Sequence, residues 1–159
     1  MRSLSLAALA ALAACATEPP ADLPVLGSVT VTNPPQNVLS ALVAVRIEGA
    51  ESVAVRYGTA GSPLDSATPA VVLRDGDVTL PVFGLLPSTT YRLRVAAYGK
   101  EGRVESDAVA LTTGALPDDL PVFRAGGPAP SPGYVAFASG VYGLIIDNTG
   151  RVVWYVRFA

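Results

Sequence analysis

A two-residue alternation of apolar and polar side chains is the feature that most constrains the fold. It recurs in short runs, because Val43, Val45 and Ile47 alternate with polar or small neighbours, as do Tyr91 and Leu93 later on. Further runs of this kind or of similar strand propensity lie at 53–57, 78–82 and 109–113. Such alternation is typical of half-buried β-strands. Gly, Pro and Asn clusters separate the runs, and no segment of useful length has a helical period. About seven short strands are thus expected in an all-β, antiparallel sandwich.

Charge and composition limit the classes of partner that this protein is expected to bind. The 159 residues carry a formal net charge of -2 and are 50% hydrophobic, with Lys100 as the single lysine. The scattered arginines form no basic stripe for a phosphate backbone, so nucleic acid is not an expected partner.

The amino terminus is interpreted as a targeting signal. Arg2 precedes an apolar run over residues 4–14 that is too short to cross a bilayer. The run ends in Leu12-Ala13-Ala14-Cys15, which resembles a bacterial lipobox. The resemblance implies cleavage before Cys15, lipid on its sulfur and, with Ala16 following, export to the outer membrane. The alternative is an ordinary secretory peptide, which would place the protein in the periplasm or outside the cell.

Four segments follow the signal peptide at 1–14. A Pro-rich tether is expected at 15–27, the sandwich at 28–114, a Pro/Gly-rich linker at 115–133 and a further β-unit at 134–159. In that last unit, two apolar runs at 144–146 and 152–156 flank residues 147–151, which predicts a hairpin. An isolated hairpin is marginally stable, so this unit is expected to need neighbours.

One run identifies the type of sandwich. Residues 85–97 resemble the L-x-P-x-T-x-Y-x-x-x-V-x-A signature of fibronectin type III domains. In this interpretation Pro87 fixes a corner of the chain, and Tyr91 buries its ring while its hydroxyl bonds back to the backbone. The tryptophan usual in that family's second strand is absent, since the one tryptophan is Trp154.

The order of segments carries a second resemblance. The lipobox, tether and sandwich are followed by Leu116-Pro-Asp-Asp-Leu-Pro121 and then by Asp147-Asn-Thr-Gly-Arg-Val-Val-Trp154. This order is similar to the amino-terminal region of bacterial aryl-sulfate sulfotransferases. That family moves a sulfuryl group between phenols through a histidine of a β-propeller. The resemblance implies that residues 134–159 form a truncated first propeller blade, and that phenolic sulfates are partners only if a propeller follows.

Histidine is absent from the sequence, so no catalytic residue is carried over from that family, and this chain alone is expected to be inactive. No cofactor is expected, the membrane is a partner through the lipid, and a homodimer is left open. The alternative function is a surface lipoprotein whose sandwich binds a protein or glycan.

Other chemistry-bearing residues are given structural interpretations. The pairs Asp75/Asp77 and Asp118/Asp119 offer too few oxygens for calcium and are taken as turn and linker residues. The Gly-rich residues 58–62 lack the lysine of a phosphate loop. Two further sets of charged residues remain. The first is interpreted as a polar hairpin rim, with an acid/base pair as the competing hypothesis. The second is interpreted as solvated sheet faces, with an anion-binding patch as the competing hypothesis. These sets are Glu101, Glu105 and Asp107, and Arg46, Arg56, Arg92 and Arg94.

Overall fold

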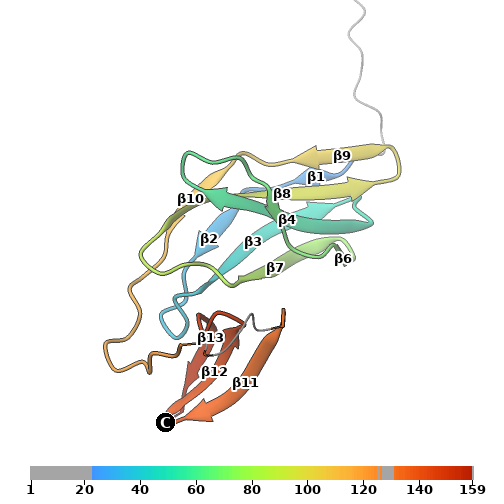
Figure 1. Ribbon diagram of the computed structural model, residues 1–159. Coiled ribbons are helices and arrows are strands. Elements are labelled where there is room, and N and C mark those ends of the chain that lie inside the picture. Colours follow the sequence, from blue (N-terminus) through green and yellow to red (C-terminus); the bar gives the residue numbers. More distant parts are fainter. Residues whose placement is uncertain (1–22, 125, 127–130, 159) are drawn as a thin grey trace, which may run out of the picture.

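A computed structural model describes residues 23–124, 126 and 131–158, and within these residues the protein consists of antiparallel strands with no helix (Figure 1). The predicted lipidation residue Cys15 and the signal peptide lie outside the described residues. The strands are β1 (Val25–Leu26), β2 (Thr30–Thr32), β3 (Ser40–Glu48), β4 (Ser52–Thr59), β5 (Ser66–Ala67), β6 (Val71–Val72), β7 (Gly76–Phe83), β8 (Thr90–Gly99), β9 (Gly102–Glu105), β10 (Val109–Thr112), β11 (Tyr134–Ser139), β12 (Tyr142–Asp147) and β13 (Val152–Arg157).

The first ten strands form two sheets in a sandwich-like arrangement. In one sheet, β3 lies between β7 and an edge made in turn by β1 and β2. In the other sheet, β8 and β4 pair with each other at the centre. The outer edge of β8 pairs with both β9 and β10, and the outer edge of β4 pairs with both β5 and β6. Seven of these ten strands have three residues or more, and the other three are two-residue edge segments. The expectation of an all-β antiparallel sandwich is therefore confirmed.

The core follows the alternation in the sequence. Along β3, Val43, Val45 and Ile47 are buried while their neighbours are exposed. The same pattern in β4, β7 and β8 joins the two sheets in one apolar cluster. Ala54 and its register partner Ala96 depart from it, since the alternation places both on the wet face and yet both are buried. Arg94 lies two residues before Ala96 on that face, and Glu105 is the register partner of Ala96. Long side chains such as these cover small neighbours.

The predicted corner residue Tyr91 lies at the start of β8. Its side chain is buried, and its hydroxyl accepts a hydrogen bond of 2.9 Å from the backbone N–H of Leu86. Pro87 is half-buried, and its carbonyl accepts the Thr89 hydroxyl at 2.8 Å. Ser88 between them has φ +47°, a left-handed conformation that a non-glycine residue rarely adopts. The backbone thus turns sharply where the sequence places the corner.

The carboxy-terminal strands form a third antiparallel sheet, in the order β11-β12-β13. The hairpin expected at residues 144–156 is present as β12 and β13, and β11 adds a strand before it. This three-stranded sheet lies at one end of the sandwich (Figure 1). No propeller is seen among the described residues.

Candidate functional site

The three-stranded sheet is held to the sandwich by a buried contact. The backbone N–H of Val38, just before β3, donates a hydrogen bond of 3.1 Å to the Tyr155 hydroxyl in β13. Leu39, Leu120 and Leu144 belong to the buried cluster around this bond. Leu120 comes from the segment expected to be a linker, so this segment contributes to the packing between the two parts.

A set of polar contacts holds the same segment to the three-stranded sheet. The Tyr142 hydroxyl donates to Asp119 at 2.6 Å, and Arg157 bonds both the Asp119 carboxylate and the Tyr142 hydroxyl at 2.9 Å. The Arg157 guanidinium also lies over the Tyr142 ring, 5.3 Å from its centre. The hydrogen bond from Tyr142, followed by the charge of Arg157, lowers the pKa of Asp119, and the same bond raises the pKa of Tyr142. Asp119 thus anchors the segment rather than pairing with Asp118 around a metal.

A groove of about 490 Å³ runs between the sandwich and the three-stranded sheet. Four of its lining residues are aromatic and come from different strands: Tyr57 of β4, Phe83 of β7, Tyr134 of β11 and Trp154 of β13. Tyr134 is 73% exposed and Phe83 is 56% exposed. Burial, and then the phenols of Tyr91 and Tyr134, raise the pKa of Tyr57. The groove therefore brings together aromatic residues from all three sheets.

A β-bulge shapes one wall of the groove. Ile145 pairs with Trp154 but Ile146 pairs with Val152, so Val153 is an extra residue in β13. Successive residues of a regular strand point to opposite faces, yet Val153 and Trp154 both line the groove. Bulges re-aim side chains in this way and are frequent beside functional sites.

Asp147 orients Arg151 at the edge of the groove. Its carboxylate accepts the backbone N–H of Thr149 at 2.9 Å, the Thr149 hydroxyl at 2.6 Å and the Arg151 Nε at 2.9 Å. These bonds outweigh burial and hold the pKa of Asp147 well below its usual range. The loop between β12 and β13 is therefore a turn held together by the Asp147 carboxylate. The opposite wall bends at Gly84, whose φ of +74° favours glycine.

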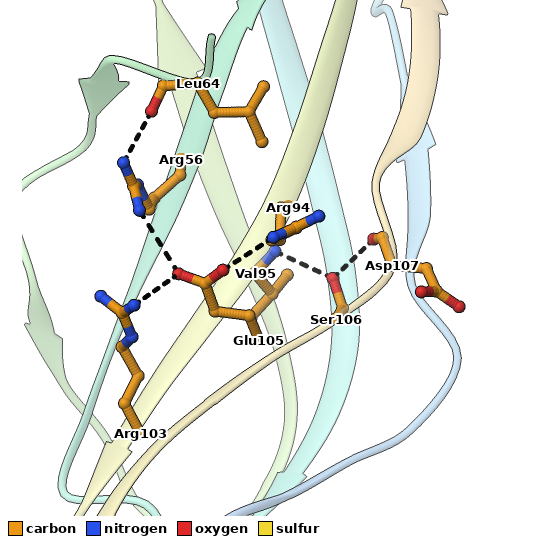
Figure 2. A network of polar contacts seen from close by, with 8 residues as sticks. All are labelled: Arg56, Leu64, Arg94, Val95, Arg103, Glu105, Ser106 and Asp107. Atoms are coloured by element: carbon orange, nitrogen blue, oxygen red, sulfur yellow. Dashed lines mark hydrogen bonds and ion pairs between the residues drawn. The ribbon is translucent and has the colours of Figure 1, made fainter.

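A cluster of three arginines around one carboxylate lies elsewhere, on the outer face of β4, β8 and β9 (Figure 2). Glu105 pairs with Arg94 at 2.8 Å, with Arg103 at 3.3 Å and with Arg56 at 3.5 Å. The hydrogen bond from Arg94 is the main cause that lowers the pKa of Glu105, and Arg103 adds to it. Arg56 also donates to the Leu64 carbonyl at 2.9 Å.

The structure separates residues that the sequence analysis grouped. Arg56 and Arg94 come together with Glu105, whereas Arg46 lies on the other sheet beside Glu48 and Asp77. Arg103 completes the cluster and was missed, since it lies outside the alternating runs. The Asp75 carboxylate accepts the Gly49 N–H at 2.8 Å, so it joins the residue before β7 to the turn after β3.

The groove was missed as a site. Tyr57 lies in the alternating run at 53–57 and Trp154 in the apolar run at 152–156, and nothing in either run indicates that both residues line one groove. The available signal was the position of aromatic residues at strand ends, as for Phe83 and Tyr134.

Neither a cluster of metal-ligating side chains nor a membrane-spanning helix occurs in the described residues. They contain no group of three or more acidic, cysteine or histidine side chains placed to hold a metal ion. Nor do they contain a helix long and apolar enough to span a bilayer. In comparisons with known proteins, neither a family model nor a curated protein matches this sequence.

Proposed function

We propose that this chain is the amino-terminal, noncatalytic portion of a lipid-anchored protein of the aryl-sulfate sulfotransferase type. Its fibronectin type III-like sandwich supports the first sheet of a β-propeller, and the lipid on Cys15 holds it at the bacterial outer membrane. The resemblance of the segments described above is the starting point, and three features of the structure support it.

The strand order supports the fibronectin-like assignment. One sheet consists of β3, β7 and an edge that β1 and β2 share. It faces a sheet with β8 and β4 at its centre and short strands along both edges. Tyr91 at the start of β8 bonds back to Leu86, five residues upstream, which is the geometry of a tyrosine corner.

The two apolar faces of the three-stranded sheet are the observation that carries the proposal. Register places Tyr134, Ile145 and Trp154 on one face, and Leu144 and Tyr155 on the other. Leu144 and Tyr155 are buried, whereas Tyr134 is mostly exposed. A sheet with one solvated face normally alternates apolar with polar residues, so two apolar faces favour a sheet stacked between neighbours, as in a propeller.

The free edge of β13 supports the same arrangement. Among the described residues β13 pairs with β12 alone, and its sequence Val-Val-Trp-Tyr-Val-Arg is strongly β-prone. Long apolar edge strands are normally covered or paired. A fourth strand added to β13 would complete a propeller blade of four strands.

The coding DNA beyond the codon for Ala159 and an activity assay test the proposal. We expect an open frame that encodes further strands with histidines, and the extended protein to transfer sulfate from 4-nitrophenyl sulfate to phenol while residues 1–159 alone do not. A stop codon followed by unrelated sequence, or an extended protein without sulfuryl transfer, would contradict the proposal.

A further inference from the structure

The aromatic groove continues into a polar one. A second hollow of about 370 Å³ shares Tyr57, Gly84 and Arg151 with the aromatic groove. Its other lining residues include Thr59, Ser62, Asp65 and Ser66. The two hollows together form one surface with an aromatic half and a hydroxyl-rich half, and each is of the size that holds a small molecule, about 300–1,000 Å³.

The aromatic half is open to ligands. Tyr134 and Phe83 come from different sheets and are both more than half exposed. Exposed aromatic residues that gather around a concave surface mark binding sites more often than scattered ones do. Ring faces such as these pack against flat apolar surfaces of a ligand.

The polar half offers hydrogen bonds with little net charge. The Thr59 and Ser62 hydroxyls bond each other at 3.1 Å on an exposed surface, and the Asp65 carboxylate is exposed nearby. Arg151 adds a cation, but its Nε is held by Asp147, which offsets the charge. Hydroxyl, carboxylate and guanidinium groups together supply both donors and acceptors.

We propose that this composite groove binds a short, neutral oligosaccharide. A sugar ring presents a flat C–H face, which fits against Tyr134, Phe83 or Trp154, and an edge of hydroxyls, which matches the donors and acceptors beside Thr59 and Asp65. The near-balanced charge favours a neutral sugar over a sulfated one. This binding role belongs to residues 1–159 with the face of Tyr134 and Trp154 uncovered, since a neighbouring sheet stacked on that face would close the groove. It goes beyond the supporting role proposed above, and its test is separate.

Trp154 provides an internal reporter, because it is the only tryptophan and it lines the groove. Its fluorescence is followed while the full chain is titrated with cellotriose, maltotriose and chitotriose. We expect a saturable change with at least one of these sugars. Tyr134→Ala and Phe83→Ala should each weaken that binding about fivefold or more, the level of a residue central to a binding site.

Phe158→Ala is the matched control. The exposed fraction of Phe158 is 53%, similar to the 56% of Phe83, but Phe158 does not line the groove. This variant should therefore bind like the parent. Thermal unfolding of each variant verifies that it folds. The proposal is overturned if no sugar changes the Trp154 signal, or if folded Tyr134→Ala and Phe83→Ala bind as tightly as the parent. It is also overturned if only a heparin-derived trisaccharide or a glycine–phenylalanine tetrapeptide produces the response. Sulfuryl transfer is not measured, so the result leaves the proposed function to its own test.

Discussion

The Tyr155 hydroxyl accepts the backbone N–H of Val38 at 3.1 Å, and this bond joins residues 117 positions apart in the sequence. Both residues are buried, so the bond is shielded from water. It fixes β13 against the chain segment that enters β3, and the groove exists because the two sheets are held in this way.

Tyr155→Phe tests that bond. The variant keeps the ring contact with Tyr142, 6.1 Å between ring centres, but leaves the buried Val38 N–H without an acceptor. We expect the free energy of unfolding to fall by about 1–2 kcal/mol, measured by urea denaturation. Tyr98→Phe is the control, because its hydroxyl makes no hydrogen bond in the described structure. Equal stability of both variants would contradict the role assigned to Tyr155.

Tyr91→Phe tests the corner of the sandwich. The change removes the acceptor of the Leu86 N–H while leaving the buried ring in place. We expect a loss of about 1–2 kcal/mol in urea denaturation. If the midpoint does not move, the hydroxyl contributes nothing and the corner is held by packing alone.

Asp147→Asn tests the turn before β13 and its pH dependence. The pKa of Asp147 is lowered in the folded state, while the pKa of an aspartate in the unfolded chain is about 3.9. Its stabilising effect is therefore complete above that value and is lost as the pH falls below it.

The midpoint of thermal unfolding, followed from about pH 6 to pH 2, should be lower for Asp147→Asn at pH 6, and the difference should shrink towards pH 2. Asp107→Asn, at an exposed carboxylate, is the control and should match the parent throughout. A difference that stays constant with pH would show that the charge of Asp147 is not what supports the turn.

Cys15→Ser tests the lipid anchor. Serine removes the sulfur to which the proposed lipid would be attached, and two or three acyl chains are what make membrane binding firm. We expect the parent to sediment with the membrane fraction and to incorporate labelled palmitate, and the variant to do neither. Membrane association of the variant that matches the parent would rule out anchoring through Cys15.

The sequence predicted the sheets well because their signal is local. The alternation around Val43, Val45 and Ile47 follows from the two faces of a strand, and the turn chemistry around residues 147–151 fixes the hairpin. Pro87 and Tyr91 fall within one short run, so their relation could also be expected from sequence.

The groove and the docking contact could not be predicted in this way. Val38 and Tyr155 lie in different segments, and their bond depends on how two sheets pack rather than on any periodicity. Leu120 and Asp119 lie in a proline-rich run that is typical of a linker, although both pack against the third sheet. The bulge at Val153 is equally invisible, because it depends on the pairing with β12.

The exchange rate of the Val38 amide hydrogen, measured by NMR, tests most directly whether the sandwich holds the third sheet. Its acceptor is Tyr155, so the amide is protected only while the sheet is docked. We predict protection comparable to that of the amides paired between β12 and β13. Fast exchange at Val38, with the amides of β3 and β8 still protected, would show that the sheet does not stay docked and would contradict the supporting role.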